Sequence, residues 1–223
     1  MPKIDMQSFQ NLMAQRWAKE RFVQKRELNK ERYVFEKFIR KDIKILDLCC
    51  GPGTYLISLH NAGYNTIGLD FSRGMLSEIK KRDKTIRTIK ADAKNIPQRD
   101  ETLDLVIFLG NSLEQIQPKE GRERVLKEVY RVLRPNGVLV LSIFNRYGLE
   151  RHLPINIFRF ITQRLRISWG NLGDTTFRLY GEIGFNHLYS YFEIKKELRK
   201  AGFKNIELKT SIISWYLIFV CKK

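Results

Sequence analysis

Three apolar segments of the sequence each end in residues that can bind a polar ligand. The first ends in the stretch LDLCCGPGT (46–54), whose glycine turn presents backbone amides at the start of a helix, where anions bind. Asp70 ends the second segment, 17 residues after Gly53, and a carboxylate there can accept both hydroxyls of a ribose. Asp92 ends the third and can accept from an exocyclic adenine amine. Together these residues predict a nucleoside site.

Other ligands that bind glycine turns fit this sequence less well. A dinucleotide fingerprint needs a third glycine, and that position is Leu56. A P-loop needs Gly-Lys-Ser/Thr, which does not follow the turn. The adjacent Cys49 and Cys50 lack the CxxC spacing and further nearby ligands, so we expect a structural turn and no metal.

The composition is that of an ordinary globular protein in a reducing compartment. The 223 residues are 43% hydrophobic and 29% charged, and the three cysteines cannot form a disulfide framework. No apolar run is long enough to cross a bilayer, and the first residues lack the apolar core of a signal peptide. We therefore expect a cytoplasmic protein without a transmembrane segment.

The net charge of +17 is unevenly distributed. Residues 1–44 carry 12 Lys/Arg against 6 Asp/Glu, residues 45–144 carry 15 against 12, and residues 145–223 carry 14 against 6. The two flanks thus supply +14, which leaves RNA open as a partner.

The ligand residues must be positioned by alternating strands and helices, the pattern of a parallel sheet covered on both faces. We expect strands over 44–48, 66–69, 85–90, 103–109 and 138–144, helices over 54–61, 73–81, 119–133 and 193–200, and a closing antiparallel pair over 205–209 and 215–221. Ser72 is the expected N-cap of the second helix, and the run 134–137 is expected to stop the third.

Two regions do not follow this alternation. Residues 1–42 are expected to form a helical N-terminal cap, and residues 145–185 an inserted cap within the main domain of residues 43–223. Both are expected over the carboxyl ends of the strands, where open α/β sheets bind ligands.

The chain resembles the class I S-adenosylmethionine-dependent methyltransferases from Ile43 to Phe144. Four segments carry the resemblance: DLCCGPG (47–53), GLDFS (68–72), ADA (91–93) and VYRVLRPNG (129–137). The first two are spelled like those of the quinone C-methyltransferases. The resemblance implies a Rossmann-like, seven-stranded, mostly parallel sheet with an antiparallel last strand, and S-adenosylmethionine as cofactor.

The resemblance also implies roles for single residues. The amides of Cys49, Cys50 and Gly51 would approach the methionine end, and Asp70 would hold the ribose. Phe71 would lie against the adenine, whose edge Asp92 and the Ala93 amide would read, while Leu109 and Gly110 would face the sulfonium. Asp47 and Gly53 would shape the turn. Because cysteine replaces the usual glycine at position 49, we expect the loop to approach the cofactor differently from an all-glycine turn.

The sequence says less about the molecule that accepts the methyl group than about the cofactor. The sequence after the fourth strand lacks the Pro-Pro turn typical of enzymes that methylate base or glutamine amines, so a small molecule is the first choice. A tRNA or rRNA acceptor and a non-catalytic cofactor-binding subunit remain alternatives. Candidate bases or pocket residues are His152, His187 and Tyr189.

The basic segment Arg151–Trp169 carries four arginines and no acid, with apolar residues at helical spacing. It is compatible with a lid over the pocket, a surface for membrane or a lipophilic acceptor, or an RNA contact. A lid is the first choice.

Overall fold

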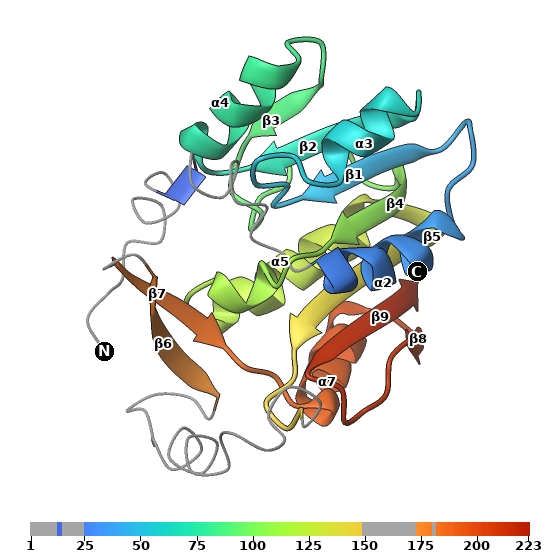
Figure 1. The fold of residues 1–223 in the computed structure, drawn as a ribbon. Coiled ribbons are helices and arrows are strands. Elements are labelled where there is room, and N and C mark those ends of the chain that lie inside the picture. The colour runs from blue at the N-terminus through green and yellow to red at the C-terminus, as the bar shows by residue number, and fades with distance from the viewer. Residues whose placement is uncertain (1–12, 15–24, 149–172, 180–181) are drawn as a thin grey trace.

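The computed structural model describes residues 13–14, 25–148, 173–179 and 182–223. Seven strands form one sheet (Figure 1). In sheet order they are β3 (Thr88–Lys90), β2 (Asn65–Asp70), β1 (Lys44–Leu48), β4 (Leu103–Phe108), β5 (Leu133–Phe144), β9 (Tyr216–Lys222) and β8 (Asn205–Leu208). Pairing is parallel from β3 to β5, and β9 runs antiparallel to both neighbours. The predicted sheet is therefore confirmed.

Helices cover both faces of the sheet. They are α2 (Lys25–Glu36), α3 (Leu56–Asn61), α4 (Arg73–Arg82), α5 (Lys119–Val132) and α7 (Tyr191–Ala201), with a short 3-10 helix η1 (Leu113–Gln115) after β4. Side chains of α5 and α7 pack against one face, and those of α2 and α3 against the other. Successive residues of a strand point to opposite faces, so Leu105 joins the α2 and α3 side and Val106 the other. This alternation of buried side chains explains why the central strands are apolar throughout.

Local sequence signals set most helix ends. The Ser72 hydroxyl accepts the Met75 amide at 3.2 Å, which confirms Ser72 as the N-cap of α4. Ser190 and Glu193 form a capping box at the start of α7. Gly202 ends α7 with a φ of +117°, a conformation that favours glycine.

Some predicted boundaries are wrong. The first helix begins at Leu56 because Thr54 and Tyr55 still belong to the glycine turn, and β3 begins only at Thr88. The fifth strand begins at Leu133 rather than 138, although the run 134–137 does interrupt its pairing. Leu103 pairs with Leu133 and Leu105 already with Val138, so the extra residues bulge out of the ladder.

The sequence analysis also missed a hairpin. Within the expected cap of residues 145–185, β6 (Asp174–Leu179) pairs antiparallel with β7 (Glu182–His187). This two-stranded sheet extends away from the main sheet (Figure 1), and β7 contacts η1 at the carboxyl end of β4. The basic segment Arg151–Trp169, with His152, lies outside the described residues.

The described part of the N-terminal region is helical, as predicted. Helix α2 lies across one face of the sheet (Figure 1), where Val34 and Phe35 pack with the central strands. Among the described residues, no helix is both long and apolar enough to cross a membrane.

Candidate active site

The turn after β1 follows a path that glycine favours. Cys49, Gly51 and Gly53 have φ values of +56°, +53° and +85°. A Cβ on Gly53 would lie 2.9 Å from a side-chain carbon of Ile79, so glycine permits close packing of the turn against α4. The Cβ of Cys49 does not move this residue out of the left-handed region. The turn therefore has a glycine-like conformation at position 49. That the loop approaches the cofactor differently from an all-glycine turn stays a prediction.

Asp70 connects the end of β2 to this turn. Its Oδ2 accepts the Gly51 amide at 2.9 Å, and its Oδ1 accepts the Ser72 amide at 2.9 Å. The side chain is buried, and burial raises its pKa to about 6, although the donated amides act in the opposite direction. The Phe71 amide also bonds to this carboxylate, which can accept about four hydrogen bonds and so retains capacity for a ligand hydroxyl.

Asp47 lies in β1, the strand next to β2, and is a second buried carboxylate. Burial raises its pKa to about 8, the Leu56 amide opposes this rise, and the nearby charges of Asp70 and Glu31 add to it. Its Oδ2 lacks a hydrogen-bond partner among the described residues. The carboxyl group therefore fixes the start of α3 through Leu56 and keeps one oxygen for a further donor.

The thiols in the turn are not activated. Burial, together with the carboxylates of Asp47 and Asp70, raises the pKa of Cys49 and of Cys50 well above the usual value for cysteine. A thiol is nucleophilic and binds metals only as the thiolate. This supports the interpretation of both cysteines as turn residues.

The end of β3 offers a more open surface. The Asp92 side chain is 55% exposed, pairs with Lys94 at 3.2 Å and accepts the Lys94 amide at 2.9 Å. Ala93 is buried, and Phe71, at the end of β2, is half-buried. The predicted nucleoside residues thus occupy the ends of two neighbouring strands, β2 and β3.

The carboxyl end of β4 is formed by Leu109 and Gly110. Gly110 has a φ of +69°, and its amide donates to the Ser142 hydroxyl at 3.0 Å. The same amide lies 3.3 Å from Oε1 of Glu31, a fully buried residue of α2. The sequence analysis missed Glu31, because a glutamate in a highly charged helix gives no local signal of burial.

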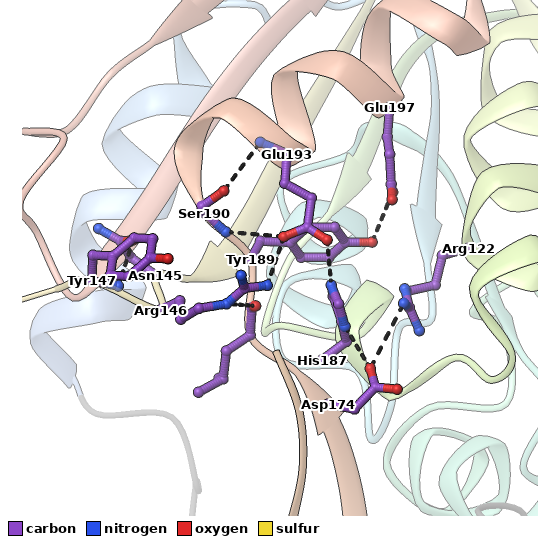
Figure 2. A network of polar contacts seen from close by, with 11 residues as sticks. Arg122, Asn145, Arg146, Tyr147, Asp174, His187, Tyr189, Ser190, Glu193 and Glu197 are labelled. Carbon is purple, nitrogen blue, oxygen red and sulfur yellow. Dashed lines mark hydrogen bonds and ion pairs between the residues drawn. The ribbon is translucent and has the colours of Figure 1, made fainter. Parts of the chain in front are cut away.

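Two predicted catalytic candidates lie in a buried polar network (Figure 2). The ring of His187 is fully buried, with Nδ1 2.6 Å from Asp174 and Nε2 3.0 Å from Glu193. Only the doubly protonated ring can donate to both carboxylates. Burial opposes ionisation of Glu193, but His187 and Arg146 outweigh it and lower the Glu193 pKa.

Tyr189 is held in the same network. Its hydroxyl donates to Glu197 at 3.0 Å, and the guanidinium of Arg122 lies 5.9 Å from the centre of its ring. Arg122 also lies 4.0 Å from Asp174 (Figure 2). Both His187 and Tyr189 are enclosed by protein, so this geometry supports a structural role in joining the hairpin to α5 and α7. The predicted base role has no support from these contacts.

The fold and the residues at the strand ends are similar to those of the class I S-adenosylmethionine-dependent methyltransferases. A glycine turn follows β1, an acid ends β2, and the sheet has one antiparallel strand near its edge. Residues 45–137 match the family model of a methyltransferase domain. Together with the relatives below, this match supports a methyltransferase that uses S-adenosylmethionine.

Two relatives of the chain are named as methyltransferases, and a solved methyltransferase structure shares its fold. YqeM of Bacillus subtilis (strain 168), provisionally named a methyltransferase, is 26% identical over 67% of this chain and 60% of that protein. The ubiquinone/menaquinone biosynthesis C-methyltransferase UbiE of Campylobacter jejuni is 26% identical over 85% of this chain and 83% of the relative. A crystal structure of a methyltransferase from Methanosarcina mazei shares the fold, with a TM-score of 0.70, 21% identity and coverage of 85% and 96% of the two chains.

The residues present fit this cofactor. A Cβ built on Gly51 or on Gly110 meets no atom within 4 Å, so space is open beside both turns. Oδ2 of Asp47, which lacks a partner among the described residues, and the remaining capacity of Asp70 can accept ligand hydroxyl or amino groups. Backbone amides of the turn can face a carboxylate.

Proposed function

We propose that this methyltransferase acts on a small-molecule acceptor at the carboxyl end of β4. The observation that carries the proposal is the cover over that end: α2 reaches Gly110 through the buried Glu31. In this proposal α2 bounds one side of the acceptor site, which is enclosed rather than an open groove. Enclosed sites suit small molecules, whereas a base within folded RNA needs an open approach.

The relatives support the same class of acceptor. The Campylobacter jejuni protein is named a C-methyltransferase of ubiquinone and menaquinone biosynthesis, which favours a quinone-related acceptor. An aromatic acceptor of this kind is the first candidate for our chain. The basic charge of the flanks keeps RNA as the second candidate.

In this proposal the residues of the chain bind and orient the cofactor. Asp70 accepts the ribose hydroxyls, Asp92 and the Ala93 amide bind the edge of the adenine, and Phe71 packs against its ring. The amides of Cys49, Cys50 and Gly51 face the methionine carboxylate. Leu109 and Gly110 lie beside the sulfonium, with Asp47 and Gly53 shaping the turn.

S-adenosylmethionine supplies an activated methyl group, so alignment and exclusion of water are the main tasks of the protein. Helix α2 covers the carboxyl end of β4 on one side, and the β6–β7 hairpin lies near η1 on the other. A base is needed only for an acceptor that is protonated at the reacting atom. His152 remains a candidate for that role.

The test uses cofactor labelled in the methyl group and a cell extract separated into RNA and small-molecule fractions. We expect label in the small-molecule fraction, and among pure compounds first on a demethylated quinol. Label in RNA, lost steeply as salt increases, would instead support the second candidate. Cofactor binding without transfer to either fraction would support a non-catalytic subunit.

A further inference from the structure

A buried carboxylate from α2 lies where β4 and β5 end and β9 begins. Glu31 has no exposed surface and accepts hydrogen bonds from the hydroxyls of Tyr55 and Tyr216. Its Oε1 is 3.3 Å from the Gly110 amide, which also donates to Ser142. Tyr216 Oη in turn lies 2.9 Å from Ser142 Oγ. We call these five residues the Glu31 cluster.

The surroundings of Glu31 suit an ionised carboxylate. Two phenolic hydroxyls and one amide point at its oxygens, and donors of this kind complement negative charge. Aromatic rings limit solvent around the cluster: Phe35 packs edge-on against Tyr55 at 5.5 Å, and Phe144 against Tyr216 at 6.0 Å. A charge in such a poorly solvated place acts more strongly on a neighbouring charge than it would in water.

Glu31 is the third carboxylate along this edge of the sheet. Asp70 ends β2, Asp47 lies in β1, and Glu31 lies at the end of β4; these three strands are neighbours in the sheet. The charges of Asp70 and Glu31 both act on Asp47, so the three groups lie within electrostatic range. The edge therefore carries three carboxyl groups beside the open spaces at Gly51 and Gly110.

The order of the strands places the ligand parts along this edge. Adenine and ribose groups belong at the ends of β3 and β2, and the methionine end at the turn after β1. The transferred methyl must face the acceptor, and the next strand in the sheet is β4. The sulfonium therefore belongs next to Gly110, on whose other side lies Glu31.

We propose that Glu31 is a positioning residue whose negative charge favours the sulfonium form of the cofactor over its neutral thioether product. The proposal rests on the proposed function, since that function places the sulfonium beside Gly110. When the methyl group leaves, its bonding electron pair stays on sulfur, which becomes neutral. The attraction to Glu31 then disappears, so the product is held less tightly than it would be by contacts alone.

The test is calorimetry on the full chain with S-adenosylmethionine and with S-adenosylhomocysteine. Glu31→Gln removes the charge and keeps an acceptor oxygen. We expect its affinity for S-adenosylmethionine to fall about tenfold and its affinity for S-adenosylhomocysteine to change less than about twofold. The matched control is Glu36→Gln, which removes an exposed carboxylate from the same helix and leaves both affinities unchanged.

Glu31→Asp separates charge from packing. It keeps the carboxylate on a shorter side chain, so the ratio of the two affinities is expected to stay unchanged even where both affinities fall. An equal loss for the two ligands in Glu31→Gln, or no loss for either, would overturn the proposal. These affinity measurements do not depend on the acceptor. Failure of the proposed function would appear instead as label in RNA, or in neither fraction of the cell extract.

A probe of the unaltered chain covers the case in which Glu31→Gln does not fold. The probe is a cofactor analogue with a tertiary amine in place of the sulfonium, which is cationic below the pKa of its amine and neutral above it. We expect the cationic form to bind about tenfold more tightly, with S-adenosylhomocysteine as the reference at each pH. Equal binding of the two forms would contradict the role of Glu31.

Discussion

The Asp70 carboxylate accepts the backbone amide of Gly51 at 2.9 Å, and this bond joins the end of β2 to the turn after β1. The two strands pair in parallel, so the residues proposed to bind the ribose and the methionine end are built as one unit.

Asp70→Asn is expected to lower cofactor affinity by about 100-fold. Asparagine offers one acceptor oxygen instead of two, and each charge-assisted hydrogen bond lost costs about 1.5 to 3 kcal/mol. Calorimetry with S-adenosylmethionine measures the effect. Glu207→Gln, which removes an exposed carboxylate on β8, serves as the control. An affinity within threefold of the parent chain would argue against a ribose contact.

Substitutions in the turn distinguish backbone from side chain. Cys50→Ser is expected to leave cofactor binding nearly intact, because the thiol is not ionised and the amide remains. Gly51→Val is expected to abolish binding: it forces a β-branched residue to a φ of +53° and fills the open space beside the turn. Circular dichroism verifies the fold of each variant. If Cys50→Ser lost cofactor binding and Gly51→Val kept it, the Cys50 thiol rather than the turn backbone would be the binding group.

Stability should depend on pH through Asp47. Its pKa is raised from the ordinary 3.8 to about 8, so the folded state binds a proton more tightly than the unfolded state does. The resulting stabilisation is complete below about pH 4 and is lost as pH rises to about 8. Asp47→Asn removes this dependence, and its melting temperature at pH 8.5 is expected to exceed that of the parent chain by about 5 °C. The gain should shrink at pH 5; a constant difference between the two pH values would contradict the assignment.

His187 should matter for stability more than for proton transfer. His187→Gln cannot donate to both Asp174 and Glu193 through two ring nitrogens, and the loss of these donors from part-buried carboxylates is expected to cost about 3 kcal/mol. Chemical denaturation measures this cost. His60→Gln is the control, since His60 is partly exposed and should change stability by less than about 0.5 kcal/mol. A normal stability with an altered pH profile of transfer would instead identify His187 as a base.

The turn and the strand-end acids of the proposed cofactor site were predictable because their signals are local. Asp47, Gly51 and Gly53 lie within one turn, and Asp70 closes the strand that pairs with β1. Apolar runs predict buried strands, and glycine marks turns with positive φ. Sequence order and spatial order agree along β1, β2 and β3, so neighbouring motifs become neighbouring strand ends.

The sequence by itself therefore determined the sheet, the glycine turn and the acidic residues at its edge. Only the tertiary structure determined which side chains of α2 and of the hairpin pack near the carboxyl end of β4. Glu31 meets Gly110 from 79 residues away and Tyr216 from 185 residues away, and His187 meets its carboxylates from the hairpin and from α7. Periodicity reports which face of an element is apolar, but the burial of a polar side chain depends on partners that arrive only when distant segments pack together.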